Sequence, residues 1–371
     1  MKNLGFGLMR LPLLKEDDQT AVDFAQLNRM VDTFLERGFT YFDTAYMYHQ
    51  GKSQIALREC LVKRHPRERF TVATKMPTML LKSRVDHERI FEEQRRDCGV
   101  EYFDFYLLHN LNVNNYAIAE KLETFEYVRQ KQKEGKVKKM GFSFHDKADL
   151  LDEILTQHPE TEFVQLQLNY LDWENESIQS RKCYEVAQRH NVPMIAMEPV
   201  KGGTLAKLPE EAEALLREHR PSASFASWAV RYVAGLEGVF MVLSGMSDYA
   251  QLDDNTAYMQ NFESLNAREH ELIAQTVNIL NRSVTVPCTA CQYCVEGCPQ
   301  HIPIPQYFAL YNNVKQSKKA AFYIQQLYYV NYSKGVGKAS DCIACGACEE
   351  SCPQHIAIIK NLKDVATVFE S

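Results

Sequence analysis

The chain has 371 residues, of which 45% are hydrophobic, and its formal net charge is −6 at pH 7. This length exceeds one ordinary domain and supports a large buried core, so we expect two domains. The acidic balance argues against nucleic acid or an anionic membrane as the main partner, because both require a basic face. Since we find neither a secretion signal nor an apolar run long enough for a membrane span, we expect a cytoplasmic protein.

Short apolar runs alternate with amphipathic segments from about residue 5 to 245. The apolar runs predict eight strands, near residues 5–9, 40–42, 69–75, 103–109, 139–145, 162–170, 192–200 and 238–245. The amphipathic segments predict helices, among them residues 53–64, 89–99, 118–135, 177–191 and 224–235. Eight such alternations are typical of an α/β (β/α)8 TIM barrel. A further helix near residues 265–280 has no strand after it, and we expect it to pack outside the barrel.

Four polar residues fall where a TIM barrel keeps its chemistry, at the carboxyl ends of strands. Asp43 is expected on the first loop turn after the second strand, and Tyr48 follows five residues later. Lys75 ends the third predicted strand and His109 ends the fourth. Each of these residues alone is ordinarily a solvated or structural group. Because parallel strand ends meet at one rim, we expect the four side chains to converge.

The words around these residues, DTAYMY, TK and LLH, resemble the aldo-keto reductase family over about residues 3–282. The resemblance implies a tetrad that reduces a small-molecule carbonyl or oxidises an alcohol. Tyr48 would donate the proton, Lys75 would lower the pKa of its phenol, and Asp43 would hold Lys75 charged. His109 would orient the carbonyl. The chemistry fits independently, because a free phenol with a pKa of about 10 is too weak an acid near neutral pH.

The resemblance also implies NADP(H) or NAD(H) as the cofactor. Ser143 and Gln165 match the residues that hold the nicotinamide amide in the family. Phe144 stands where the family has Asn, and Met197 stands where it has the aromatic side chain that stacks on the nicotinamide. These departures leave FMN open as an alternative cofactor.

The phosphate end of the cofactor site departs from the family as well. Gly245 and Gln251 replace basic residues that grip the 2′-phosphate of NADP, whereas Asp254 and Asn255 keep the adenine-side pattern. Two glycine-containing loops still favour a phosphate site, because glycine allows close backbone approach and barrels bind phosphate after strands seven and eight. Their residues are Lys201, Gly202 and Gly203 after strand seven, and Ser244, Gly245, Met246 and Ser247 after strand eight.

Eight of the eleven cysteines form two runs with the spacing C-x2-C-x2-C-x3-C-P. The first run is Cys288, Cys291, Cys294 and Cys298, and the second is Cys342, Cys345, Cys348 and Cys352. This spacing marks [4Fe-4S] sites, so we expect two clusters. Structural zinc is the competing interpretation, but it usually uses paired Cys-x2-Cys knuckles. Cys60, Cys98 and Cys183 lie singly in helical patterns and are expected to be small buried hydrophobes.

The C-terminal region resembles two-cluster bacterial ferredoxins, in which the fourth Cys of each run binds the other cluster. The resemblance implies Cys288, Cys291, Cys294 and Cys352 for cluster one, and Cys342, Cys345, Cys348 and Cys298 for cluster two. The spacer is long and predicts helices at 303–314 and 318–332, which is more like the helical ferredoxin domain appended to many dehydrogenases. We therefore expect a barrel domain at 1–282 and a small, mainly helical iron–sulfur domain at 283–371.

Residues 299–340 contain five lysines and no Asp or Glu; the lysines are Lys315, Lys318, Lys319, Lys334 and Lys338. Such a patch can dock an acidic electron carrier such as a ferredoxin or flavodoxin. The alternative is that the lysines offset the negative clusters or lie on a solvated helix face.

Cubane clusters pass single electrons, whereas a nicotinamide delivers a hydride, so the two halves leave three functions open. The barrel is a carbonyl reductase using NAD(P)H with structural or sensing clusters, or it binds FMN and receives electrons through the clusters, or the protein is a non-catalytic electron-transfer or redox-sensing module. An intact tetrad favours an oxidoreductase over a non-catalytic module, and the family resemblance favours a nicotinamide over a flavin. Candidates to line the substrate pocket are Tyr46, Asn110, Tyr170 and Trp173, although loop packing is the more usual role of such residues.

Overall fold

The computed structural model describes residues 2–15, 18–175, 178–282, 285–288, 292–316, 322–352 and 355–371. These residues form two compact units. Unit 1 comprises Met1–Asn169, Arg181–Pro199 and Ser227–Leu265. Unit 2 comprises Tyr170–Ser180, Val200–Ala226 and Asn266–Ser371, so it contains the loop that follows strand six and much of the segment that follows strand seven.

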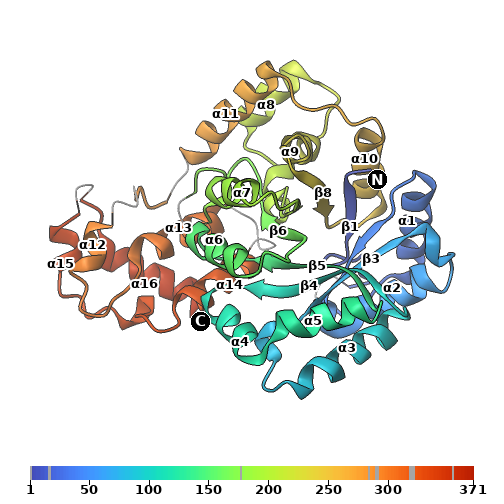
Figure 1. Ribbon diagram of the computed structural model, residues 1–371. Coiled ribbons are helices and arrows are strands. Elements are labelled where there is room, and N and C mark those ends of the chain that lie inside the picture. Colours follow the sequence, from blue (N-terminus) through green and yellow to red (C-terminus); the bar gives the residue numbers. More distant parts are fainter. Residues whose placement is uncertain are drawn as a thin grey trace. The chain divides into compact units, whose positions relative to one another are not determined.

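Unit 1 holds a closed barrel of eight parallel strands in sequence order, which confirms the predicted fold (Figure 1). The strands are β1 Leu4–Gly7, β2 Tyr41–Asp43, β3 Thr71–Met76, β4 Phe103–Leu111, β5 Val137–Phe144, β6 Phe163–Gln167, β7 Met194–Met197 and β8 Val239–Ser244. Asp43 is the last residue of β2 rather than the first of a loop. Lys75 and His109 lie one and two residues before the ends of β3 and β4.

The interior of the barrel is filled by apolar side chains, so the barrel is a packed core and its chemistry lies at the rim. The buried cluster contains Tyr41, Ala73, Phe105, Leu107, Phe163, Ile195, Met241 and Leu243. Gly141 on β5 is required for this packing, because a Cβ atom there would lie 2.2 Å from the Phe163 carbonyl oxygen. Glycine therefore lets β5 and β6 approach each other closely.

The helices that alternate with the strands are α1 Phe24–Glu36, α2 Lys52–Leu57, α3 Val85–Cys98, α4 Val113–Leu122, α5 Thr124–Lys133, α6 Ala148–Gln157, α7 Ser180–Arg189, α8 Glu210–His219, α9 Phe225–Ala234 and α10 Tyr249–Gln260. The single helix expected at 118–135 is wrong, because the chain forms α4 and α5 there. Glu123 adopts a positive φ of 59° and ends α4. Glutamate gives no warning of this, since a positive φ is uncommon for residues other than glycine.

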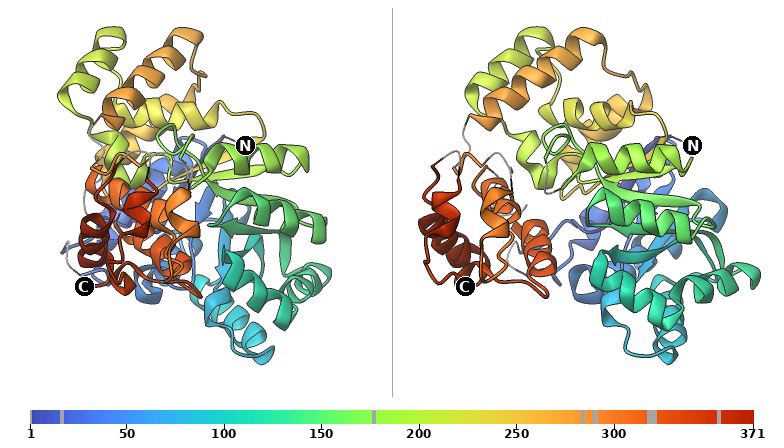
Figure 2. Two further views of the ribbon diagram at one scale, coloured as in Figure 1. Left: turned by 90° about the vertical axis from the view of Figure 1, so that its left-hand side faces the viewer. Right: turned by 60° about the vertical axis from the view of Figure 1, so that its left-hand side comes forward.

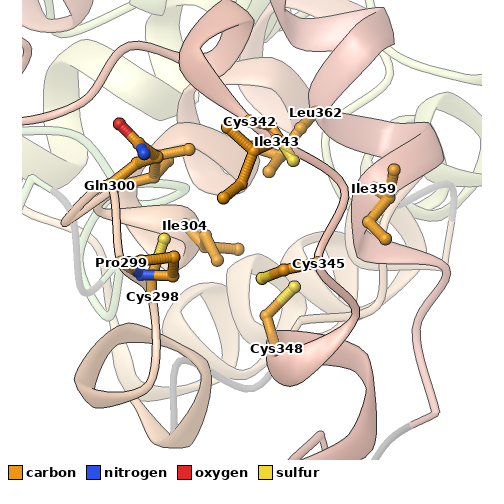
Figure 3. A pocket seen from close by; sticks show the side chains of 11 residues that line it. Cys298, Pro299, Gln300, Ile304, Cys342, Ile343, Cys345, Cys348, Ile359 and Leu362 are labelled. Carbon is orange, nitrogen blue, oxygen red and sulfur yellow. The ribbon is translucent and has the colours of Figure 1, made fainter.

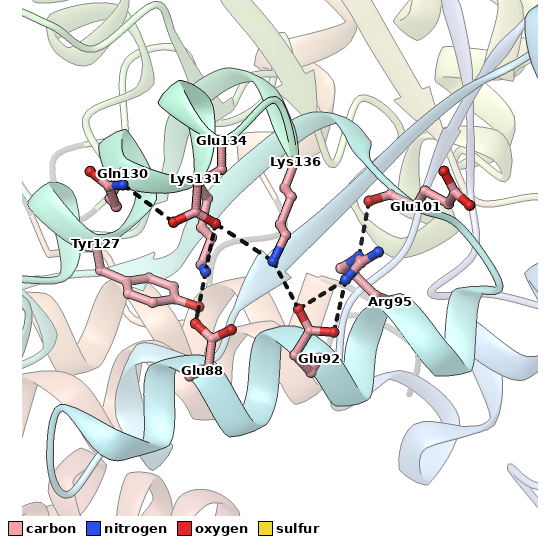
Figure 4. Close-up of polar contacts among 9 residues, drawn as sticks. All are labelled: Glu88, Glu92, Arg95, Glu101, Tyr127, Gln130, Lys131, Glu134 and Lys136. Atoms are coloured by element: carbon pink, nitrogen blue, oxygen red, sulfur yellow. Dashed lines mark hydrogen bonds and ion pairs between the residues drawn. The ribbon is translucent and has the colours of Figure 1, made fainter.

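Ion pairs join the outer faces of α3 and α5 (Figure 4). Lys131 on α5 pairs with Glu88 on α3 at 2.8 Å, and Lys136 pairs with Glu92 at 3.5 Å. Glu92 also pairs with Arg95 on its own helix at 2.8 Å. Lys131 is buried, whereas Glu88, Glu92 and Lys136 are open to solvent. Ion pairs open to solvent contribute little stability each.

Unit 2 is mainly helical in its described residues, as expected for the C-terminal region (Figure 2). Besides α8 it contains α11 Ala267–Asn281, α12 Tyr293–Glu296, α13 Ile304–Gln316, α14 Phe322–Tyr332, α15 Ala347–Glu350 and α16 Ile358–Phe369. α11 contacts α8, and α13 contacts both α14 and α16. The core between α13, α14 and α16 includes Tyr307, Phe308, Tyr328, Leu362 and Phe369. In the described part of the chain, no helix combines the length and apolar character needed to cross a bilayer.

Candidate active site and cluster ligands

A buried ion pair lies at the carboxyl ends of β2 and β3. Lys75 is fully buried, and its ammonium donates a hydrogen bond to Asp43 Oδ1 at 2.5 Å and another to the Thr44 carbonyl oxygen at 2.8 Å. β2 and β3 pair in parallel with Asp43 opposite Ala73, so the two side chains reach the same rim. Asp43 Oδ2 has no hydrogen-bond partner among the described residues.

The pair keeps Lys75 charged. Burial by itself lowers the pKa of Lys75, but the charge of Asp43 and the Tyr48 hydroxyl more than offset this and raise the pKa above its ordinary value. Burial raises the pKa of Asp43, and Lys75 opposes that rise. Because the ammonium donates directly to the carboxylate, we take the pair to be ionic at neutral pH.

Tyr48 and His109 complete the predicted group of four. Tyr48 begins the 3-10 turn Tyr48–Gly51, and Lys75 Nζ lies 5.0 Å from its ring centroid. The Tyr48 and His109 ring centroids are 5.9 Å apart, edge to face. Burial raises the pKa of Tyr48 above its ordinary value, while Lys75 acts to lower it. The lowering expected from Lys75 is therefore present, but burial outweighs it.

Two titratable neighbours of the tetrad were not predicted from the sequence. His145 directly follows β5, and burial, with a smaller contribution from Lys75, lowers its pKa to about 4. Glu198 directly follows β7, and its charge raises the pKa of Tyr48. His109 is also neutral, because burial lowers its pKa well below the ordinary value. Position at a strand end is the signal by which both neighbours could have been found.

The residues expected to hold the nicotinamide lie at the ends of β5, β6 and β7. Ser143 is buried, and its Oγ accepts a hydrogen bond from the Asn110 backbone N–H at 2.8 Å. Gln165 Nε2 donates to Met197 Sδ at 3.4 Å, and Gln165 Oε1 is buried with no partner among the described residues. Phe144 packs against Phe142 with ring centroids 6.3 Å apart. An unpartnered amide oxygen is thus ready to accept a hydrogen bond from a ligand.

The loop after β8 is largely closed on itself. Asn255 Nδ2 donates to Ser244 Oγ at 2.8 Å. Asp248 caps α10 by accepting from the Gln251 N–H at 2.8 Å. Gln251 Oε1 in turn accepts from the Ser247 N–H at 2.9 Å, and its Nε2 donates to Asp248. The Gln251 side chain is therefore engaged within the loop, and a carboxylate already occupies the N-terminus of α10.

One basic residue at this loop was missed. A Cβ atom at Gly245 would lie 3.1 Å from Arg10 Cβ and Cγ, so Arg10 lies directly against the glycine. Arg10 follows β1, which pairs with β8 when the barrel closes. The Met246 side chain is fully buried, and Asp254 lies on α10. Closure of the barrel is the feature from which Arg10 could have been predicted.

The loop after β7 places its lysine differently from expectation. Lys201 is 1% exposed, and its ammonium forms an ion pair with buried Asp172 and donates to Asn313 Oδ1 at 3.1 Å, all within unit 2. Gly202 and Gly203 adopt positive φ angles of 60° and 96°. The Lys201 charge is thus already neutralised, which removes a cation from the predicted phosphate loop.

Four cysteines surround one cavity in unit 2, and they are the set expected for cluster two (Figure 3). Its lining includes Cys298, Cys342, Cys345 and Cys348 together with Ile302, Ile304, Ile359 and Leu362. Burial raises the pKa of Cys348 to about 11, and the charges of its cysteine neighbours add to this rise. Four thiols converge here from both cysteine runs, as a crossed ligand arrangement requires.

Of the cysteines expected for cluster one, Cys291 lies outside the described residues. Cys294 and Cys352 are buried, Cys288 is partly exposed, and all three belong to the apolar core of unit 2. The helices that carry the two runs, α12 and α15, contact each other. Cys60, Cys98 and Cys183 are buried as expected.

The remaining candidates lie in several places. Tyr46 donates its hydroxyl hydrogen to Glu93 Oε2 on α3 at 2.7 Å, which makes it a loop-packing residue. Asn110 is buried on β4, and Tyr170 and Trp173 belong to unit 2. In the lysine patch, Lys334 and Lys338 are exposed and Lys315 lies 5.0 Å from the Tyr311 ring centroid. Two further lysines of the patch, 318 and 319, lie outside the described residues.

Two family models match the chain. The aldo/keto reductase family matches residues 3–278, and the 4Fe-4S dicluster domain matches residues 287–357. A curated relative, 9,11-endoperoxide prostaglandin H2 reductase from Trypanosoma cruzi, is 28% identical over 200 residues. That match covers 53% of this chain and 64% of the relative, so the chain spans slightly less than two thirds of the relative's length.

Solved structures are similar over the barrel. The holo form of aldo-keto reductase AKR11C1 from Bacillus halodurans is 25% identical with a TM-score of 0.59, and the match covers 74% of this chain and 91% of that chain. An aldo-keto reductase from Klebsiella pneumoniae in complex with NADPH is 18% identical with a TM-score of 0.57, covering 74% and 90%. The second likeness bears on the fold alone.

Proposed function

Because the chain belongs to the aldo/keto reductase family and carries a 4Fe-4S dicluster domain, it is an oxidoreductase, and we propose that it reduces a small-molecule carbonyl, or oxidises the alcohol, with NAD(P)H. The observation that carries this proposal is the buried Asp43–Lys75 ion pair beside Tyr48 and His109. These side chains supply a proton donor, a cation that tunes it and a neutral imidazole at one rim.

The residues of the rim divide the work of carbonyl reduction. A bound nicotinamide supplies the hydride for the carbonyl carbon. Tyr48 releases its phenolic proton to the carbonyl oxygen, and the Lys75 ammonium stabilises the phenolate that is left. Asp43 keeps Lys75 charged. Neutral His109 hydrogen-bonds the carbonyl oxygen and orients it, which lowers the entropic part of the barrier.

The residues at the barrel rim fit the nicotinamide end of the cofactor better than the phosphate end. Gln165 Oε1 is a buried acceptor without a partner among the described residues, and it matches the amide N–H of a nicotinamide. At the phosphate end, Lys201 and Gln251 are engaged within the chain, and Arg10 is a basic residue that lies beside Gly245.

We propose that unit 2 holds two [4Fe-4S] clusters. Four thiols around an apolar cavity suit cluster two, because cubane clusters are held by Cys thiolates in a largely apolar setting. Structural zinc usually takes paired Cys-x2-Cys knuckles, whereas both cysteine runs here have the C-x2-C-x2-C-x3-C-P spacing of cubane clusters.

A second candidate is an FMN-containing reductase that receives single electrons through the clusters from an acidic carrier such as a ferredoxin or flavodoxin. It is favoured by the loop after β8, where Gly245 and the self-paired Gln251 stand at the two positions that are basic in the NADP-binding family, although Arg10 lies beside Gly245. Exposed Lys334 and Lys338 would guide the carrier. Analysis of the molecule released from anaerobically purified protein distinguishes the two, since flavin is yellow and fluorescent. If the purified protein reduced no carbonyl with either cofactor, the non-catalytic electron-transfer or redox-sensing function would be the one that remains.

The test of the tetrad is Tyr48→Phe, with Tyr46→Phe as a matched control. The Tyr46 hydroxyl pairs with Glu93 on α3, so its loss removes an equivalent group outside the predicted chemistry. We expect Tyr48→Phe to lower kcat/KM for NAD(P)H-dependent carbonyl reduction by about 100-fold or more, because general acid catalysis contributes that much. Iron and sulfide contents should not change. Activity retained by Tyr48→Phe would remove Tyr48 from its role.

A further inference from the structure

β4 contains one extra residue where it passes β5. Leu108 lies opposite Phe142 and Leu111 opposite Phe144, so three steps along β4 match two along β5. His109 and Asn110 together therefore oppose Ser143. Phe142 contacts Phe125 on the outer helix α5, which places Ser143 on the inner side. Because both residues of a bulge oppose one partner residue, Asn110 shares the inner side of the rim with His109.

The backbone of Asn110 is held firmly in an uncommon conformation. Its φ is +60°, and its N–H donates to Ser143 Oγ at 2.8 Å. Its carbonyl oxygen accepts from Asn115 Nδ2 at 2.7 Å and from Asn112 Nδ2 at 3.2 Å. Both of these asparagines are buried. Asparagine adopts left-handed backbone more readily than most residues other than glycine, and these hydrogen bonds hold Asn110 in that conformation.

The side chain of Asn110 is not satisfied in the same way. It is 3% exposed, and Asn110 Oδ1 has no hydrogen-bond partner among the described residues. A buried acceptor without a partner is costly, so native proteins rarely keep one without a use for it. The adjacent His109 Nδ1 is likewise buried without a partner in the described chain. Two neighbouring residues thus present open hydrogen-bonding capacity at the rim.

We propose that Asn110 forms a substrate subsite that accepts a hydrogen bond from a hydroxyl group on the carbon next to the reacting carbonyl. The preferred substrates are then α-hydroxy carbonyl compounds, such as hydroxyketones and small sugars. Consecutive residues have Cα atoms about 3.8 Å apart, so His109 and Asn110 can contact groups on neighbouring carbons. This subsite rests on the proposed carbonyl reductase function.

The test compares hydroxyacetone with acetone in the wild type and in Asn110→Gly. Glycine keeps the positive φ while removing the amide, so the backbone of the bulge is preserved. The control is Asn191→Gly, another asparagine with positive φ that lies in an exposed turn. We expect Asn110→Gly to lower kcat/KM for hydroxyacetone about 10- to 100-fold and to change that for acetone less than about threefold. The ratio of variant to wild-type kcat/KM is taken for each ketone separately, so the intrinsic difference in reactivity between the two ketones cancels.

Equal losses on the two ketones would show a purely structural role and overturn the subsite. A wild type that reduces neither ketone nor any other carbonyl would refute the proposed function instead. The subsite is then decided by calorimetry with the non-reducible pair glycolamide and acetamide. Tighter binding of glycolamide, lost in Asn110→Gly, supports the subsite, and equal binding of the two amides overturns it.

Discussion

Replacing Asp43 with Asn should change the pH dependence of both activity and stability. In the wild type, burial by itself lowers the pKa of Lys75, and the charge of Asp43 more than offsets this. The amide of Asn keeps the shape of the carboxylate but removes its charge, so burial becomes the main influence. We therefore expect the pKa of Lys75 to fall below its ordinary value of about 10.5.

The size of the change follows from the geometry of the pair. Both side chains are buried, with Lys75 Nζ 2.5 Å from Asp43 Oδ1. Removing one partner of a buried ion pair costs about 3–5 kcal/mol. Part of this cost falls on the charged form of Lys75, so the pKa of Lys75 should fall below its ordinary value. Loss of the proton then moves from the alkaline range toward neutral pH.

The sign of the stability change distinguishes this effect from simple damage. In the wild type the pKa of Lys75 is raised, so its contribution is complete below the unfolded pKa and is lost as pH rises through the folded pKa. In Asp43→Asn the folded pKa is the lower one, and the unfolded chain binds the extra proton between the two values. The free energy of unfolding of the variant should therefore rise with pH across that interval.

The assay is kcat/KM for carbonyl reduction from about pH 6 to 10, together with denaturant unfolding at the same pH values. This range covers the expected fall of the Lys75 pKa from the alkaline range toward neutral pH. Asp104→Asn is the matched control, because Asp104 pairs with Arg67 and Lys138 at the start of β4. It should lower stability without moving the alkaline limb of the activity profile. An alkaline limb in Asp43→Asn that coincides with that of the wild type would refute the reasoning.

Two further predictions concern unit 2. Asp172→Asn leaves the buried Lys201 ammonium without its counter-ion, so calorimetry should show that the free energy of unfolding falls by about 3–5 kcal/mol. The double variant Asp172→Leu with Lys201→Met should recover most of this loss, because no charge stays buried. A double variant as unstable as Asp172→Asn would contradict this account. Cys298→Ser should remove about half of the iron and sulfide if it binds cluster two, while the control Cys183→Ser keeps all of it. Full iron retention in Cys298→Ser would exclude it as a ligand.

The barrel and the position of the tetrad could be predicted because their signals are local. Each strand is a short apolar run, and Asp43, Lys75 and His109 come at the ends of consecutive runs. Parallel closure then brings those ends together without further information. The crossed cysteine set followed from a family resemblance, and four of its members do meet at one cavity.

The features that escaped prediction depend on distant partners. Glu123 divides α4 from α5 although glutamate favours helices, and it is followed by fully buried Thr124, whose hydroxyl contacts His87 of α3 at 3.0 Å. The bulge that turns Asn110 inward exists only in the pairing of β4 with β5. Nothing in the sequence around these residues records the neighbour that decides their conformation.

The contact of Lys201 with Asn313 has a consequence for how the protein is made. The two residues are 112 positions apart, so the segment after β7 leaves the ribosome long before α13 can supply its amide. At about 5–20 residues per second, translation separates the two events by several seconds or more. During that interval the Lys201 ammonium can pair with Asp172 but not with Asn313. A chain shortened at residue 282 would lack the hydrogen bond to Asn313 permanently.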